Sequence, residues 1–299
     1  MWFRNLQIHR IAPDATLEAD AFAGQLVAHA FQPCTSLMLE SRGWIPPRGD
    51  DRLVCVLNHQ WLLALGVEKK LLPSSVIRQN VQQRAAEIES MTGMKPGRKR
   101  QRELKEEVTD ELLPRAFSTY RTTFAWIDPA ARWLMIDASS EKRGEEFMEH
   151  VRKSVTDAPF ALVRTGRSPS AAMAEWLIAR EAPAGFTIDR ECVLQSPLEE
   201  KSTVRYTRHT LVDTDEIRNH IRDGKQPIQL ALTWQDRVSF VLTDKCEIRK
   251  AALLEMAKPE DQPDAESAEA QFETDFVLMT GMLGGLIADL IEALGGEAE

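Results

Sequence analysis

The sequence of 299 residues lacks the features that mark secreted, disulfide-bonded or membrane-spanning proteins. Its four cysteines, Cys34, Cys55, Cys192 and Cys246, lie far apart and form no CxxC pair, as is usual for buried thiols in a reducing compartment. The least polar stretch, residues 276–288, is uncharged over 13 residues. A membrane span needs about 20, so this stretch predicts a buried helix. The N-terminus shows no basic start followed by an apolar run, and we therefore expect a cytoplasmic protein.

Catalytic signatures are equally scarce. The chain has no GxxxxGK[ST] loop, and its six histidines lack the spacing of a zinc site. The glycines of GMLGG at 281–285 lie in an apolar segment, which favours close helix packing over phosphate binding. One acidic trio, Asp213, Asp215 and Glu216, has the residue types of a metal-dependent nuclease. The trio also fits a helix start, with Asp213 as N-cap and Glu216 three positions later. We favour the helix start and expect no catalytic residue, no metal and no cofactor.

Positive charge is missing from one end of the chain and gathered elsewhere. The formal net charge is −9, yet residues 259–299 contain eleven acids and no Lys or Arg. Removing those eleven negative charges leaves +2 for residues 1–258. Because binding depends on where charge sits, the overall acidity does not exclude a polyanionic partner.

Hairpin signals alternate with helical periods and predict an α+β fold. Pairs of apolar strands flank Asn58-His59, Asp128-Pro129 and Gln235-Asp236, and helical periodicity follows at 17–30 and 141–154. We expect antiparallel sheets built from hairpins, with helices on one face. The predicted units are an N-terminal unit (1–73 with 114–158), a helical hairpin (74–113), a second α+β unit (159–258), and an acidic linker with a C-terminal helix (259–299).

The helical hairpin is predicted to protrude from the sheet as an arm. One apolar stripe runs from Ile77 to Met91 and a second from Leu104 to Leu112, separated by Pro96-Gly97. Two helices of about 20 residues each make an arm of roughly 30 Å. Its turn carries a basic cluster, comprising Lys95, Arg98, Lys99, Arg100, Arg102 and Lys105.

Local ion pairs account for only part of this basic cluster. At i,i+4 spacing Lys99 pairs with Glu103 and Arg102 with Glu106, each contributing about 0.2–0.5 kcal/mol. The other four cations have no such partner, so the turn is either merely solvated or a phosphate-binding surface. Further cations favour a surface that follows a phosphate backbone. They are Arg115, Arg121, Lys201, Arg205, Arg208, Arg218, Arg222 and Lys225.

Several motifs stand in the order found in one known family. They are WFRNL at 2–6, FQPC at 31–34, GWIPP at 43–47, EKKLLPSSVI at 68–77, LLPRAFSTY at 112–120, DFVLMTG at 275–281 and EALGGE at 292–297. With these motifs the chain resembles, from end to end, the RdgC family of bacterial recombination-associated proteins.

The resemblance implies a non-enzymatic protein of the nucleoid. Members of this family form ring-shaped homodimers around double-stranded DNA, bind it without marked sequence preference, and restrain RecA-promoted strand exchange. A closed C2 ring needs two isologous contacts, and the family's LPRAF phenylalanine, here Phe117, lies at a ring-closing contact. A Lys-Gln pair implicated in DNA contact corresponds to Arg208 and His209. Arg208 keeps the positive charge, whereas His209 departs from the family pattern.

Together these patterns give one set of expected DNA contacts. Arg205 and Arg208 are three residues apart, so a continuous strand directs them to opposite faces, and both line one surface only if the strand ends there. The expected contacts are Lys95, Arg98, Lys99, Arg100, Arg102, Arg115, Arg205, Arg208 and His209.

Two other functions compete with DNA encirclement. The first is a metal-dependent nuclease or phosphodiesterase that uses the acidic trio. The second is a protein-interaction scaffold whose acidic segment and last helix recruit partners. For that helix we expect a part in the dimer contact, with packing inside the subunit as the alternative. The residues concerned are Phe276, Leu278, Leu283, Leu286 and Leu290.

Overall fold

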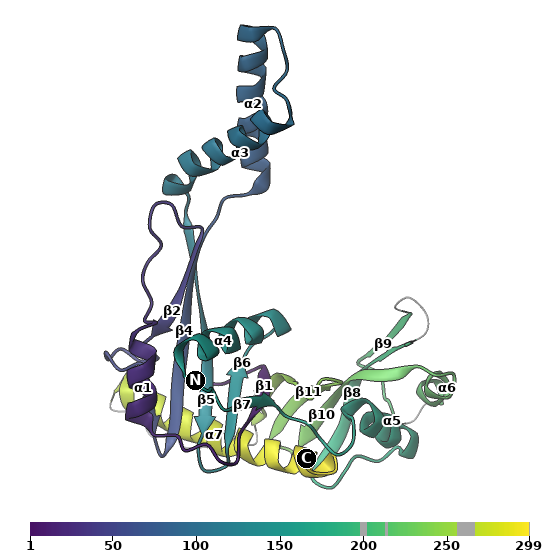
Figure 1. Cartoon of the computed structure of the whole chain (residues 1–299). Helices are drawn as coiled ribbons and strands as arrows, with labels where there is room; N and C mark the ends of the chain where they lie inside the picture. The colour runs from purple at the N-terminus through teal and green to yellow at the C-terminus, as the bar shows by residue number, and fades with distance from the viewer. Residues whose placement is uncertain (198–201, 213–214, 256–266, 299) are drawn as a thin grey trace.

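A single antiparallel sheet organises the protein. The structure, a computed structural model, describes residues 1–197, 202–212, 215–255 and 267–298 (Figure 1). In these residues twelve strands join in the order β2-β4-β5-β6-β1-β12-β11-β10-β8-β9, with β3 beside β4 and β7 beside β1. The strands are β1 (Leu6–Ile11), β2 (Glu40–Ile45), β3 (Cys55–Leu57), β4 (Gln60–Lys70), β5 (Ser118–Asp128), β6 (Trp133–Asp137), β7 (Phe160–Leu162), β8 (Phe186–Gln195), β9 (Thr203–Thr207), β10 (Gln226–Trp234), β11 (Val238–Thr243) and β12 (Ile248–Leu253).

The three predicted hairpins are confirmed, and local turn chemistry explains them. Asn58 and His59 have φ of 48° and 62°, and Gln235 and Asp236 have φ of 47° and 53°. Two central residues with positive φ make the turn whose twist matches that of the paired strands. In the β5–β6 hairpin the turn is longer, and Asp128 Oδ1 accepts a hydrogen bond from the Ala131 amide at 2.9 Å.

Helices pack on both faces of the sheet, so the expectation of helices on one face is wrong. The helices are α1 (Ala19–Val27), α2 (Ser74–Thr92), α3 (Arg98–Leu112), α4 (Glu141–Ser154), α5 (Pro169–Ala179), α6 (Glu216–Arg222) and α7 (Ala268–Ala293), with a short 3-10 turn at Leu113–Arg115. Helices α1 and α4 cover one buried cluster, and α5, α6 and α7 belong to the other. The physical reason is strand alternation: Leu6 and Ile8 pack with α7, whereas Gln7 faces α4.

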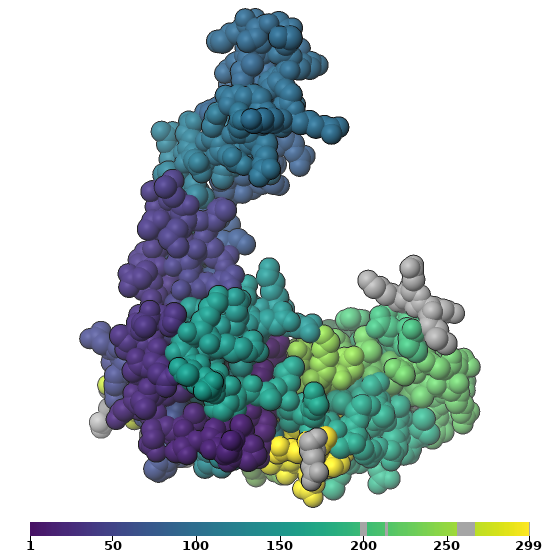
Figure 2. Space-filling view, viewed as in Figure 1, coloured from purple at the N-terminus to yellow at the C-terminus, as the bar shows by residue number. Residues whose placement is uncertain are grey.

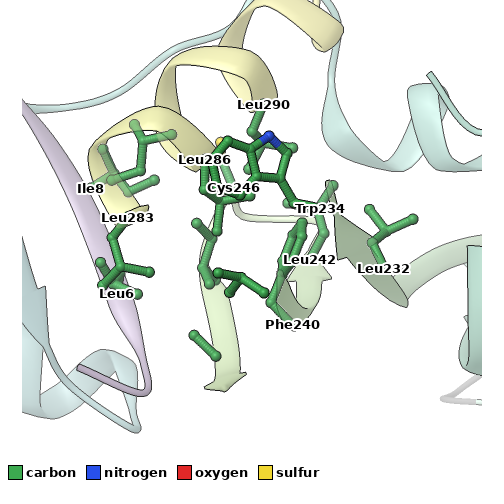
Figure 3. Packing of buried hydrophobic residues seen from close by; sticks show 14 of the residues in the cluster. Leu6, Ile8, Leu232, Trp234, Phe240, Leu242, Cys246, Leu283, Leu286 and Leu290 are labelled. Atoms are coloured by element: carbon green, nitrogen blue, oxygen red, sulfur yellow. The ribbon is translucent and has the colours of Figure 1, made fainter. Parts of the chain in front are cut away.

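The C-terminal helix α7 is a core element that spans both halves of the sheet. Figure 3 shows Leu283, Leu286 and Leu290 against Leu6 and Ile8 of β1 and against residues of β10 and β11. Phe276, Leu283, Leu286 and Leu290 are fully buried within the subunit, and Leu278 is half-buried. Packing inside the subunit therefore accounts for these residues, and the expected dimer contact through α7 is corrected.

Two observations show that the apolar side chains of α7 pack inside the protein. A Cβ at Gly285 would lie 3.0 Å from the Trp234 ring, so this glycine permits close helix packing, as the sequence predicts. Among the described residues α7 alone has the length and composition of a membrane span. Its six fully buried side chains from Phe276 to Leu290 identify it as the core helix of the sheet.

The helical arm is confirmed and stands away from the sheet (Figure 1). Helix α2 ends at Gly93, whose φ of 72° is left-handed, and α3 starts after Gly97. The helices have 19 and 15 residues, so α3 is shorter than expected. Leu104 and Val108 of α3 are buried, but α2 has no buried residue and Met91 is 84% exposed. The arm is thus a thin two-helix element without a core of its own.

A buried histidine below α4 makes stability depend on pH. Burial, aided by the charge of Arg152, lowers the pKa of His9 to about 4. Between about pH 6.5 and pH 4 the unfolded chain therefore binds the proton that the folded chain excludes, so the free energy of unfolding falls as pH falls. The loss from His9 is at most about 3 kcal/mol over this window.

We expect His9→Asn to reduce this pH dependence, measured as the denaturant midpoint at pH 7.0, 5.5 and 4.5. Parallel pH profiles for the variant and the native chain would contradict the assignment.

Candidate nucleic-acid interface

The molecule is hollowed between the arm and the second half of the sheet. In Figure 2 the arm rises on one side of this hollow and the segment around β9 on the other. The arm extends from β4 and β5, whereas β9 is the last strand of the sheet at the opposite edge. The predicted cations therefore divide into two groups, one on each rim.

The first group lies at the turn of the arm. Lys95 precedes α3, and Arg98, Lys99, Arg100 and Arg102 occupy its first turns, all with exposed side chains. No acidic residue stands in the first turn of α3, although acids are favoured there. The sequence thus places cations where the helix dipole disfavours them. Helix stability alone does not explain their position.

The ion pairs of the arm differ in part from those predicted. Arg102 pairs with Glu106 at 3.2 Å, as predicted. Glu103 is paired with Arg100 at 3.2 Å rather than with Lys99, and Arg100 also reaches Glu107 at 2.8 Å. The guanidinium presents several donors to two carboxylates, which an ammonium does less well. Lys95 has a distant partner, Glu89, at 4.0 Å.

Three cations of the basic cluster remain unpaired in the described part of the chain. Arg98, Lys99 and Lys105 have no carboxylate within 4.0 Å among these residues. Arg100, predicted to be free, is instead neutralised by its two partners. The cations most available to a phosphate are therefore Arg98 and Lys99.

The second group lies on the edge strand β9. Arg205 is exposed opposite Val193 of β8, and the strand ends at Thr207. Arg208 then adopts a left-handed conformation with φ of 57°. The strand end removes the alternation that would direct Arg205 and Arg208 to opposite faces.

His209 follows at the same edge and is exposed. Its amide donates to the Arg190 carbonyl at 3.2 Å, and its ring lies 5.5 Å from the ring of Tyr206. These contacts hold the backbone after β9 against β8. Lys201 and Asp213 lie outside the described residues.

Phe117 and Arg115 lie where the arm joins the sheet. Arg115 ends the 3-10 turn and is exposed, and Phe117 is 84% exposed, although large aromatic side chains are usually buried. The Phe117 carbonyl accepts a hydrogen bond from the Leu71 amide at 2.7 Å, and the Leu39 carbonyl accepts one from the Lys70 amide at 2.9 Å. Exposed apolar side chains gather at this junction. This arm-base patch comprises Leu37, Met38, Leu39, Leu71, Phe117 and Tyr120.

Two buried charged residues fix the arm to the sheet. Lys70 Nζ donates to the carbonyls of Ser36 at 3.2 Å and Leu113 at 3.1 Å. Glu68 accepts hydrogen bonds from the Cys34 amide at 2.7 Å and the Tyr120 hydroxyl at 3.1 Å. The Cys34 amide is the main cause that lowers the pKa of Glu68, so this carboxylate stays ionised. Sequence reasoning missed both residues, since a charged pair at the end of a strand looks like solvated surface.

Two members of the acidic trio, Asp215 and Glu216, lie among the described residues. Asp215 is bound by Arg180 at 2.7 Å and lies 3.6 Å from Arg218. Helix α6 begins at Glu216, and Asp215 stands at its N-cap without a side-chain cap. Within residues 1–197, 202–212, 215–255 and 267–298, no three His, Cys, Asp or Glu side chains are grouped to hold a metal. The predicted N-cap at Asp213 falls outside the described residues.

Comparison with known proteins agrees with the motif order. Residues 1–297 match the sequence model of a family described as "Putative exonuclease, RdgC". The chain is 48% identical to the recombination-associated protein RdgC of Janthinobacterium sp. (strain Marseille), over 100% of this chain and 99% of that protein. It is also 48% identical to the proteins of the same name from Dechloromonas aromatica (99% and 98% covered) and Herminiimonas arsenicoxydans (99% and 99% covered).

The chain belongs to the RdgC family. The resemblance inferred from seven short motifs is thereby confirmed over the whole length. The structure of this RdgC protein also brings together side chains that sequence reasoning did not single out. They line a cleft between α4 and the strands β2, β4 and β5 below the arm. They include Arg42, Lys69, Lys142 and Arg143.

We expect the arm of this RdgC protein to loosen when Lys70 is replaced by Met. The variant keeps the approximate length of the side chain but removes the ammonium that binds the Ser36 and Leu113 carbonyls, which destabilises the fold by about 1–3 kcal/mol. The Leu113 carbonyl keeps its hydrogen bond from the Ala116 amide. Amide hydrogen exchange at residues 34–39 and 113–118 should become faster. Lys69→Met is the matched control, because Lys69 is 62% exposed and meets only Glu40 at 3.7 Å. Equal exchange in both variants would show that Lys70 does not anchor the arm.

Proposed function

We propose that this protein is a non-enzymatic, double-stranded DNA-binding protein that encircles duplex as a ring-shaped homodimer. It acts on the nucleoid in the cytoplasm, binds without sequence preference, and restrains RecA-dependent recombination by occupying DNA. Membership of the RdgC family and the name of its relatives support a role in DNA recombination. The observation that carries the proposal is the placement of exposed cations on both rims of one hollow, on the arm and beside β9.

Charge and shape favour contact with the phosphate backbone over base reading. In the described structure the cations are divided between the start of α3 and the edge strand β9, and are not gathered on one recognition helix. Trp126, Trp133 and Trp234 are buried in the sheet and are not available to stack on bases. Backbone contact is independent of sequence and weakens as salt rises, because each phosphate contact releases counterions.

The arm-base patch supports self-association. The patch has six exposed side chains, and in the described structure only Tyr120 among them makes a side-chain hydrogen bond within the subunit, to Glu68. Exposed apolar clusters of this kind mark interaction sites. A C2 dimer places the same patch of both subunits at one contact, and a second isologous contact closes the ring. We assign the ring-closing contact to Phe117 and its neighbours.

The competing functions receive less support. The scaffold hypothesis needs an available apolar helix, but α7 is committed to the core of the subunit. The nuclease hypothesis needs a metal site, and the description of the family as an exonuclease is the reason to test it. Incubation of the protein with supercoiled plasmid and Mg²⁺ or Mn²⁺ decides between DNA binding and DNA cleavage.

The proposal is tested by measuring mass in solution with and without DNA. We expect a dimer alone, a salt-sensitive complex with linear duplex, and retention on closed circular duplex when salt is raised. Plasmid incubated with either metal should stay supercoiled. A monomer that fails to bind duplex at low salt, or nicking that depends on metal, would overturn the proposal.

The arm cations should determine part of the salt dependence. Replacing Arg98 and Lys99 with Ala is expected to lower the slope of log affinity against log salt by about 0.9 for each phosphate contact removed. Arg100→Ala is the internal comparison, since Glu103 and Glu107 already neutralise Arg100. Arg52→Ala, near α1 and paired with Asp50, removes the same charge away from the arm. An unchanged slope for the double variant would mean that the turn of the arm is only solvated.

Truncating Phe117 should weaken the dimer and spare the fold. An interface aromatic removed by alanine substitution typically costs about 1–3 kcal/mol of association free energy, or roughly tenfold to a hundredfold in the dimer constant. The thermal midpoint at high protein dilution should stay the same, since Phe117 is 84% exposed. Leu162→Ala, also exposed but on β7, is the control. If both variants dimerise like the native chain, Phe117 does not lie in the contact.

A further inference from the structure

The cleft between α4 and the strands β2, β4 and β5 below the arm collects positive charge from these four elements. We call it the arm-base cleft, and its volume is about 240 Å³. Its lining comes from β2, β4 and β5 on one side and from the start of α4 on the other. The lining residues are Glu40, Arg42, Val67, Lys69, Thr119, Arg121, Ser140, Lys142, Arg143 and Glu146. Five cations thus surround two carboxylates.

The two carboxylates neutralise only the strand side of this cleft. Glu40 holds Arg42 at 2.5 Å and Lys69 at 3.7 Å. Glu146 holds Arg121 at 2.5 Å and lies 3.6 Å from Arg42. These bonds fix the three strand cations in place, as a preorganised site requires. Arg42 also lies 3.9 Å from Glu149, so the strand cations are largely balanced and the uncompensated charge of the cleft lies on α4.

The two cations of α4 have no such partners. In the described part of the chain neither Lys142 nor Arg143 has a carboxylate within 4.0 Å, and Arg143 contacts only the Ser139 hydroxyl at 3.4 Å. Both stand in the first turn of α4, where a cation opposes the helix dipole. Arg121 adds a buried Nε that has no hydrogen-bond partner among the described residues. Among the described residues no carboxylate within 4.0 Å offsets Lys142 or Arg143, so an anion that enters the cleft meets uncompensated positive charge.

The size of the cleft limits the class of anion. A volume of about 240 Å³ is below the range of pockets that enclose whole small molecules. It accommodates one phosphate group whose remainder stays outside. Guanidinium groups suit phosphate oxygens because they present paired donors in one plane. Figure 1 shows α4 beside β5 and β6, below the helical arm and facing the hollow, where a polymer would pass.

We propose that the arm-base cleft is a phosphate-binding site that seats one backbone phosphate of bound duplex. Lys142 and Arg143 supply the free charge, and Arg121 with Arg42 forms the fixed wall behind it. This inference rests on the proposed function and adds a contact between the two rims, at the foot of the arm. Of the cleft cations only Arg121 was named by the sequence analysis, whereas Arg42, Lys69, Lys142 and Arg143 were not.

The test compares two double variants of the full-length protein, with duplex binding measured against salt. For Lys142→Gln with Arg143→Gln we expect about tenfold weaker binding near 0.15 M salt and a slope lowered by about 0.9 for each cleft. The charge-conserving pair Lys142→Arg with Arg143→Lys should restore binding. Lys153→Gln, at the other end of α4 and paired with Glu149 at 2.7 Å, is the control that should change nothing. Equal thermal midpoints establish that the variants fold.

A parallel titration with inorganic phosphate distinguishes a site for DNA backbone phosphate from a site for free phosphate. Amide NMR shifts at residues 140–146, with chloride at equal ionic strength as reference, report phosphate in the cleft. Shifts with phosphate together with weaker duplex binding by the Gln pair support the proposal. Phosphate shifts without any effect on duplex overturn the assignment to DNA and leave a free-phosphate site. If the Gln pair binds like the native chain while the Arg98 and Lys99 variant weakens, the cleft proposal fails and DNA binding stands. If the native chain binds no duplex, the proposed function and the cleft assignment fail together.

Discussion

Helix α7 packs across the junction between the two halves of the sheet. The relative position of every candidate DNA contact depends on this packing. The two halves of the sheet meet where β1 pairs with β12, and this register includes only Leu6 opposite Ile248. So short a ladder does little to fix an angle between two halves. Helix α7 supplies the rigidity, because its side chains pack against β1, β10 and β11 in one continuous cluster. A fully buried Leu contributes roughly 1.5–3 kcal/mol, so Leu283, Leu286 and Leu290 together hold the junction strongly.

The arrangement also explains how an acidic chain can offer a cationic hollow. Helix α7 carries much of the acidic C-terminal segment and lies along the sheet on the side away from the arm and β9 (Figure 1). Some of its acids are already neutralised: Asp275 by the N-terminal amine at 2.8 Å, and Glu269 and Glu273 by Arg48. At physiological salt, exposed charges act over about 8 Å. Acids beyond the sheet therefore repel a polyanion in the hollow only weakly.

Local signals in the sequence were sufficient for the hairpins, the arm and α4, since each is specified by residues close in the chain. Local signals did not predict that helices cover both faces of the sheet, although one signal for this was present. Strand β4 reads QWLLALGVEKK, an almost unbroken buried run, and such a run indicates a strand covered on both faces. The predicted partner of Glu103 in the arm was wrong for a different reason. Spacing alone favoured Lys99 for Glu103, but the longer fork of Arg100 reaches Glu103 and Glu107 at once.

The candidate site was predicted less completely than the fold. Exposed cations on the arm and beside β9 follow from composition and motif, and both groups are where the elements place them. The arm-base cleft could not be found in this way. Its members range from Glu40 to Glu146, and only the order of strands in the sheet brings them together. The arm-base patch has the same origin, as Leu39, Leu71 and Phe117 meet through backbone pairing at the junction.

The C-terminal position of α7 has a consequence for biosynthesis. The cluster around α1 and α4 uses residues between Ile11 and Phe160, so it is complete before the second half of the chain has been synthesised. The larger cluster joins Phe3 to Leu294 and cannot close until the last helix has left the ribosome. Nascent chains thus carry a finished N-terminal core beside strands whose apolar face is still open. Such chains are prone to aggregation, and a premature stop that removes α7 leaves them permanently in that state.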